Sequence, residues 1–134
     1  MSAKDLVKKP DLSGPKATAT TLIIGLSCKN LRGFVYMWTN IFSFILSTKN
    51  ADGCLQTLNG ISSPFKILLV SYWQSPEQIT RFVRSKEHVS WMQFIYRHPT
   101  SLNLFNETYG APVRANYINA VAGYAATVDG GEQV

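Results

Sequence analysis

Two segments of this chain are apolar at both odd and even positions, a pattern that few folds accommodate. The first, TATTLIIGLSC, spans residues 18–28, and the second, PFKILLVSYW, spans residues 64–73. Side chains of a β-strand point alternately to the two faces of a sheet, so both strands present apolar side chains to both faces. Pro64 lacks an N–H and suits the first position of a strand, so we expect the second strand to begin there. Both faces of the resulting sheet must be covered.

The rest of the chain supplies helices and further strands. In order, we predict a helix over 31–50, a short strand over 54–61, the strand over 64–73, two consecutive helices between Ser75 and Pro99, a strand over 102–109, and a weaker strand or extended tail over 115–128. Ser75 is a typical N-cap, with a proline after it and a glutamine three residues on, which predicts a capping box. Ser85 is a second predicted cap. The order β-α-β-β-α-β is that of the ferredoxin-like α+β fold.

A four-stranded sheet of this type has helices on one face, so its second face needs another cover. Only 16% of the residues are charged, which is low for a monomer. A second copy of the chain, packed sheet to sheet, is the simplest cover. The sequence therefore predicts a homodimer packed sheet to sheet.

The length and the composition predict one domain. At 134 residues with 46% hydrophobic content, the chain can build one core. We expect a flexible, strandless N-terminal arm over 1–18, the domain over 19–128 and a polar tail over 129–134. No signal peptide follows Met1, and Cys28 and Cys54 show no metal-binding spacing, so a cytoplasmic protein with reduced thiols is expected.

The charge pattern argues against two classes of macromolecular partner. The net charge of +5 is scattered, and no basic run is interleaved with aromatic residues, so we expect no nucleic-acid partner. The apolar segment FVYMWTNIFSFILS spans 14 residues, which is shorter than a bilayer span. We therefore expect a buried helix there and no membrane partner.

Several motifs carry a resemblance to a known family. The segments LIIGLSCKNLRGF, DGCLQT, LLVSYWQSPEQITRFVRSKEHVSWMQF and FNETYGAPVRANYINAV occur in this order. They resemble a family of small monooxygenase-like proteins in the dimeric α+β barrel superfamily, distantly related to phenylacetaldoxime dehydratases. Four of the family's elements can be matched here: Tyr72, Trp73 and Ser75; His88 and Trp91; Glu107, Thr108 and Tyr109; and Asn119. Relatives commonly have a histidine where this chain has Asn106, which favours a reaction different from theirs.

His88, Glu107 and Tyr109 are the candidate catalytic residues. An imidazole titrates near neutral pH, and a carboxylate in apolar surroundings has a raised pKa, so both could move protons. The candidate substrate-binding residues are Tyr72, Trp73, Trp91, Phe94, Trp38 and Asn106. The ordinary alternatives are a helix-start histidine, a surface ion pair of Glu107 with an arginine, and aromatic side chains of the core. Asn106 and Glu107 must point to opposite faces of their strand.

We expect no metal or organic cofactor. Haem, which the resemblance to the dehydratases brings in, needs an axial ligand such as His88 or His98. His98 precedes Pro99 at a helix end, where a cationic imidazole suits the helix dipole. The favoured function is a small-molecule tailoring enzyme of specialised metabolism that cyclises or isomerises an apolar, conjugated, polyketide-like substrate by acid–base catalysis. The alternatives are a cofactor-independent monooxygenase and a non-catalytic protein that binds hydrophobic ligands.

Overall fold

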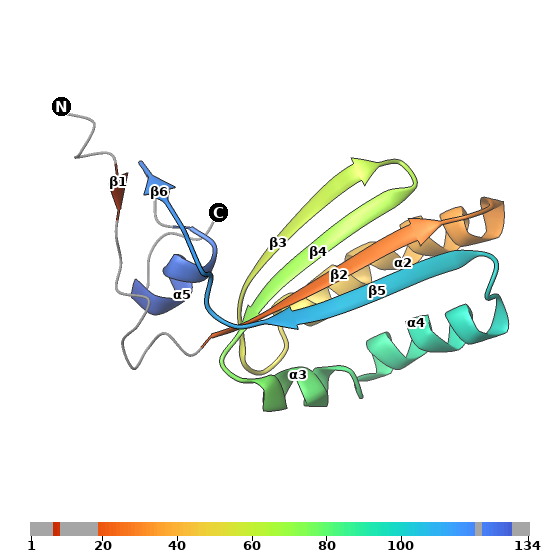
Figure 1. Ribbon diagram of the computed structural model, residues 1–134. Helices are drawn as coiled ribbons and strands as arrows, with labels where there is room; N and C mark the ends of the chain where they lie inside the picture. The colour runs from red at the N-terminus through yellow and green to blue at the C-terminus, as the bar shows by residue number, and fades with distance from the viewer. Residues whose placement is uncertain (1–6, 9–18, 120–121, 130–134) are drawn as a thin grey trace.

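A four-stranded antiparallel sheet with helices on one face forms the body of the protein (Figure 1). The computed structural model describes residues 7–8, 19–119 and 122–129. The elements of the body are β2 (Thr20–Cys28), α2 (Leu31–Lys49), β3 (Cys54–Ser63), β4 (Lys66–Trp73), α3 (Pro76–Phe82), α4 (Lys86–Arg97) and β5 (Leu102–Tyr109). The strand order β3-β4-β2-β5 is that of the ferredoxin-like α+β fold, which confirms the predicted fold class.

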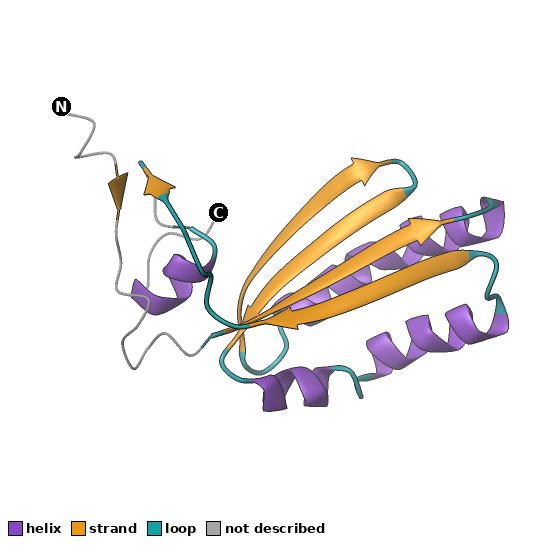
Figure 2. Cartoon of the chain, in the orientation of Figure 1, coloured by secondary structure: helices purple, strands orange, loops and turns teal. Residues whose placement is uncertain are grey.

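The core lies between the sheet and the three helices, which Figure 2 shows on the same side of the strands. The even-numbered positions of β2, including Leu22, Ile24 and Leu26, are buried against Met37 and Ile41 of α2. We call this side the helix face. The opposite side, the open face, carries the odd-numbered positions of β2, and the described helices leave most of it uncovered. The two-sided apolar pattern therefore belongs to a sheet that has one face covered by helices and one face left largely uncovered.

The start of α2 is held against the turn that precedes β5. Asn30 caps the helix by accepting a hydrogen bond from Gly33 N at 3.0 Å, and the Lys29 N–H donates to the Ser101 carbonyl at 2.8 Å. Arg32 Nη1 lies 2.8 Å from His98 Nδ1. Arginine can only donate, so this imidazole nitrogen accepts. This contact between Arg32 and His98 ties the end of α4 to the start of α2.

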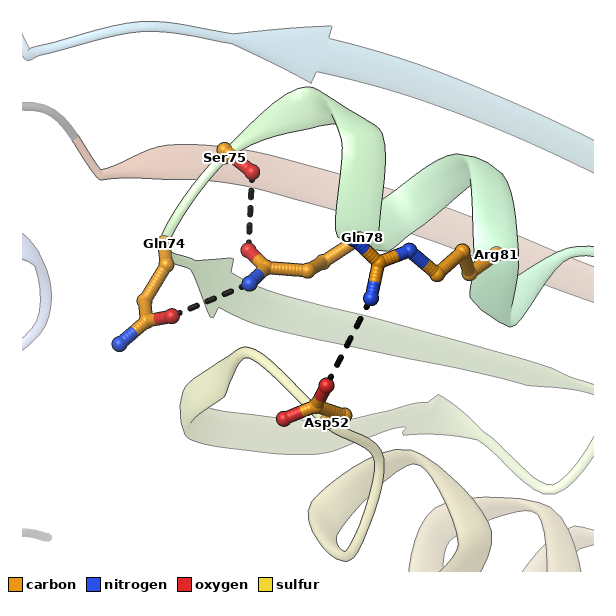
Figure 3. A network of polar contacts seen from close by, with 5 residues as sticks. All are labelled: Asp52, Gln74, Ser75, Gln78 and Arg81. Atoms are coloured by element: carbon orange, nitrogen blue, oxygen red, sulfur yellow. Dashed lines mark hydrogen bonds and ion pairs between the residues drawn. The ribbon is translucent and has the colours of Figure 1, made fainter.

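The predicted capping box at Ser75 takes a different form in the structure. Ser75 is the N-cap residue of α3, but its hydroxyl donates to Gln78 Oε1 at 2.9 Å and caps no backbone N–H (Figure 3). Gln78 Nε2 in turn donates to Gln74 Oε1 at 3.1 Å. Beside them Arg81, in the last turn of α3, pairs with Asp52 at 3.7 Å, which links the end of α3 to the turn after α2. Ser85 caps α4 as predicted, accepting from the His88 N–H.

Three further predictions differ from the structure. Pro64 and Phe65 form the two-residue turn between β3 and β4 instead of opening a strand, and Ser63 Oγ accepts from the Phe65 N–H there. Within the arm that was expected to lack strands, Val7–Lys8 form β1, which pairs with β6 (Tyr117–Ile118). The predicted tail strand is replaced by β6 and a short helix, α5 (Tyr124–Asp129). The other residues of the arm and the tail lie outside the described residues.

The helix α5 packs at one end of the open face. Its Tyr124 is buried against Ala19 and the partly buried Leu55 and Tyr72. Among the described residues, no helix is long and apolar enough to cross a membrane.

Candidate active site

The candidate residues divide between the two faces of the sheet. In the β2/β5 ladder Asn106 lies opposite Ile24 on the helix face, whereas Glu107 lies opposite Ile23 and Tyr109 opposite Thr21 on the open face. Tyr72 of β4 also lies opposite Thr21, so it shares the open face. The parity argument for Asn106 and Glu107 is therefore confirmed. His88 belongs to the helix side and cannot share one site with Glu107 and Tyr109 in a single subunit.

His88 lines a small cavity under the first turn of α4. The cavity has a volume of about 10 Å³ and is lined by Ile24, Leu26, Phe44, His88, Trp91 and Leu104. The rings of Phe44 and Phe82 lie 6.2 Å and 6.0 Å from the imidazole. His88 Nδ1 is buried and has no hydrogen-bond partner. An unpaired polar atom in an apolar enclosure is costly and calls for an explanation.

The surroundings of His88 favour an uncharged imidazole. Burial lowers its pKa below the usual 6.5, and a hydrogen bond to the Val83 backbone raises it by a smaller amount. An uncharged imidazole keeps one ring nitrogen with a free lone pair. The buried, unpartnered Nδ1 is the candidate for that nitrogen. Such a nitrogen can accept a proton from a molecule that enters the cavity.

Among the predicted aromatic residues, Trp91 alone lines this cavity. Trp91 is buried and meets the ring of Tyr36 edge-on at 5.1 Å. Trp73 has no exposed surface and packs in the core against Phe82, and its Nε1 donates to Ser71 Oγ at 2.8 Å.

Two more of the predicted aromatic side chains, Phe94 and Trp38, make packing contacts away from the cavity. Phe94 stacks on Tyr36 at 3.8 Å, and Trp38 Nε1 donates to the Pro64 carbonyl at 2.9 Å on the outer side of α2. The ordinary reading, aromatic side chains of the core and of helix contacts, is the one that describes Trp73, Phe94 and Trp38.

The helix face is open to solvent beside the cavity. Along β5, Leu102 is buried and Leu104, which lines the cavity, is half-buried. Asn106 and Thr108, the next two residues on the same face, are exposed. A molecule can therefore approach the cavity from the Asn106 end of β5.

The open-face pair does not lie in the apolar surroundings that were expected. Glu107 is exposed, and the Tyr109 hydroxyl donates to Glu107 Oε2 at 2.6 Å. This hydrogen bond is the main cause of the raised pKa of Tyr109. Among the described residues, Glu107 forms no ion pair with an arginine, so the expected surface ion pair is not found.

Tyr72 belongs to a polar cluster under α5 that the sequence did not reveal. It meets the ring of Tyr124 edge-on at 6.4 Å, and burial raises the pKa of both phenols. Gln56 lies opposite Tyr72 and is buried, and neither polar atom of its carboxamide has a hydrogen-bond partner. Nothing in the spacing of Gln56 distinguishes it from other strand residues.

The open face also carries a groove that no sequence pattern predicted. It has a volume of about 460 Å³ and lies between β2, β4 and β5, with Leu68 and Phe105 as apolar walls and Lys66 and Asn103 at its polar end. Its floor includes Gly25, where an added Cβ would lie 2.0 Å from the Phe105 ring. A glycine inside a strand often marks such a close approach and was the one available signal.

The residues present do not fit haem. As it stands, the cavity beside His88 cannot hold a porphyrin, and a porphyrin is much larger than the small-molecule substrates considered; Nδ1 of His98 is engaged by Arg32. In the described part of the chain, no group of three or more His, Cys, Asp or Glu side chains is placed to hold a metal ion. Burial raises the pKa of the Cys54 thiol to about 11, so this thiol is not an activated nucleophile.

The fold is shared with several solved structures of low sequence identity. A Pseudomonas aeruginosa protein, PA3566, is 13% identical with a TM-score of 0.61, and the match covers 75% of this chain and 100% of that one. A putative antibiotic biosynthesis monooxygenase from Deinococcus radiodurans is 16% identical with a TM-score of 0.59, covering 73% and 98%. SnoaB, a cofactor-independent oxygenase from Streptomyces nogalater, is 5% identical with a TM-score of 0.55, covering 72% and 95%.

The family is shown by a direct sequence match. None of the curated proteins compared with the chain matches it. The family described as monooxygenase af470-like matches residues 20–121, which include β2 to β6 and the His88 cavity. This match confirms the resemblance to small monooxygenase-like proteins. The chain belongs to the monooxygenase af470-like family.

Proposed function

We propose that this protein is a cofactor-independent oxygenase of apolar, conjugated small molecules, with His88 as its general base. The observation that carries the proposal is the buried, unpartnered Nδ1 of an imidazole that its surroundings keep uncharged. The family is named for monooxygenases, and one structural neighbour is a cofactor-independent oxygenase, which supports oxygenation over other proton-transfer reactions.

In the proposed reaction the substrate itself supplies the electrons. His88 Nδ1 takes a proton from an acidified CH₂ group, and the resulting carbanion adds O₂ to give a hydroperoxide. Loss of water then leaves a ketone, so CH₂ and O₂ become C=O and H₂O. The apolar walls provided by Phe44, Trp91 and Leu104 exclude solvent from the carbanion.

Substrate binding requires the cavity to enlarge. Its volume of about 10 Å³ holds no more than one water, whereas small-molecule sites usually measure roughly 300–1,000 Å³. We propose that α4 moves away from β5 and that the loop between α3 and α4, residues 83–85, takes up the movement. Asn106 then lies at the entrance and offers a carboxamide to a polar substituent.

Cyclisation or isomerisation is the second candidate because this chain has Asn106 where the family resemblance leads us to expect a histidine. The first step, proton removal by His88, is the same. The carbanion then closes a ring or is reprotonated elsewhere, and no oxygen is consumed. A carrier of hydrophobic ligands would bind the same compounds without converting them.

Oxygen dependence separates these functions. We expect the purified protein to consume O₂ with a panel of apolar conjugated phenols and enols, in the presence of a metal chelator, and to insert one ¹⁸O atom from ¹⁸O₂ into the product. Turnover without oxygen uptake would overturn the oxygenase in favour of cyclisation or isomerisation. Saturable binding with no product under any atmosphere would support the carrier.

We further propose that the open face is the interface of a homodimer. Phe105 and Leu68 of this face are exposed in the single chain, and burying such side chains against a second sheet is favourable. Replacing Phe105 by glutamate is expected to convert a dimer into monomers in native mass spectrometry, because two buried carboxylates would lack partners. Tyr96→Glu, on the exposed side of α4, is the control and should remain dimeric. A wild-type monomer, or a dimeric Phe105→Glu, would contradict this interface.

A further inference from the structure

The helix α2 is apolar on two opposite sides. One side, with Met37, Ile41 and Phe44, is buried against the sheet. The other side, the outer stripe, consists of Leu31, Val35, Phe42 and Leu46, which are 76%, 50%, 69% and 59% exposed. With about 100° per residue these four fall within roughly 60° of arc. An exposed apolar stripe of this length commonly marks a surface that binds a partner or a membrane.

The outer stripe continues onto the tip of the β3–β4 hairpin. Phe65 at this tip is 56% exposed, and its ring lies 5.8 Å from that of Phe34. A groove of about 600 Å³ at this end is lined by Leu31, Phe34 and Phe65 together with Lys29. The Trp38 indole, through its hydrogen bond to Pro64, fixes the hairpin tip against the helix. The outer stripe and the hairpin tip thus form one continuous ridge. The part of this ridge on α2, from Leu31 to Leu46, is about 22 Å long.

The charges around this ridge are cationic. The helix contains no aspartate or glutamate. Lys29 and Lys49 lie at its two ends and are exposed, while the exposed Asp52 in the turn after α2 is paired with Arg81. An apolar ridge bordered by lysines is the pattern of helices that lie in the interface of anionic membranes, where the lysine ammonium groups reach the lipid headgroups.

We propose that the outer stripe binds the surface of an anionic lipid bilayer, with α2 parallel to the membrane and not across it. This revises the expectation of no membrane partner, and it is independent of the chemistry at His88. A second copy is a poorer cover for this ridge. Two outer stripes packed together would bring cations from both chains close to each other, with no carboxylate on either α2 to neutralise them.

Vesicle flotation of the full chain tests the proposal. We expect the protein to float with vesicles of phosphatidylcholine and phosphatidylserine, to remain behind with phosphatidylcholine alone, and to be released by high salt. Phe42→Gln should weaken binding about tenfold or more, because a large side chain no longer enters the bilayer. The double variant Lys29→Gln/Lys49→Gln should weaken it about 25-fold, about fivefold for each cation.

Matched variants on α4 serve as controls. Tyr96→Gln removes an equally exposed aromatic side chain, and Lys86→Gln removes a cation at the start of that helix. Both should float like the wild type, and circular dichroism checks that all variants fold. Failure of the wild type to float, equal binding to both vesicle types, or equal losses in the controls would each overturn the proposal. The protein could instead self-associate without floating. If Phe42→Gln abolishes that self-association, the outer stripe binds a second copy of the chain and not a membrane.

Discussion

Replacing Gly33 by alanine is expected to lower the free energy of unfolding by about 3 kcal/mol, at the upper end of the usual range for overpacking. A Cβ at this position would lie 1.9 Å from the Ser101 carbonyl oxygen. This oxygen belongs to the backbone and is held by the Lys29 N–H, so it cannot rotate away. The helix must shift instead, and the Asn30 cap on Gly33 N is strained with it.

The control for this prediction is Gly60→Ala on β3. A Cβ added there meets no atom within 4 Å. We expect this variant to be neutral or slightly stabilised, because alanine reduces the freedom of the unfolded chain. Urea denaturation of the two variants measures both values. A Gly33→Ala variant as stable as Gly60→Ala would show that α2 is not seated on Ser101 as described.

Replacing His88 by glutamine is expected to reduce kcat on any substrate that the oxygen assay identifies by a factor of about 10²–10⁴, the usual contribution of a general base. The loss follows because glutamine fills similar space but cannot take up the proton. His98→Gln is the matched control, since His98 contacts Arg32 and lies outside the cavity. This control should keep wild-type turnover. A His88→Gln enzyme with undiminished kcat would remove His88 from the mechanism.

The same variant makes a prediction on pH that needs no substrate. Burial lowers the pKa of His88 in the folded state, so the unfolded chain binds a proton more readily. The stability that an uncharged His88 contributes is therefore fully present above about pH 6.5, the unfolded pKa, and is lost as pH falls toward the lower folded pKa. The melting temperature of the wild type should fall over this window more steeply than that of His88→Gln. Parallel curves would contradict the depressed pKa.

Much of the fold follows from local pattern. Two-sided apolar runs identify β2 and β4, the serine caps place α3 and α4, and the strand Leu102–Tyr109 has the predicted bounds. The prediction that a strand begins at Pro64 was wrong because the Pro-Phe turn lacks the glycine or asparagine that usually marks two-residue loops. The prediction for the segment after β5 was inaccurate because β6 forms by pairing with β1. That pairing is a contact between distant parts of the sequence.

The candidate site was only partly predictable, for a related reason. Strand parity separates Asn106 from Glu107, but both faces are apolar, so parity alone does not say which face encloses His88. The spacing of Trp73 and Phe94 is compatible with a cavity wall and with core packing alike. The distinction comes from how α4 crosses the sheet: it brings Trp91 to the cavity and turns Phe94 toward Tyr36.

The chain contains three tryptophans, and each lies in a different environment. Trp38 donates a hydrogen bond to Pro64 at the hairpin tip, and Trp73 donates one to Ser71 in the core. Trp91 lies beside His88. Their three indole N–H resonances therefore form a built-in set of NMR reporters. Lipid should shift the Trp38 signal, a substrate should shift that of Trp91, and Trp73 should remain as an internal reference until the whole protein unfolds.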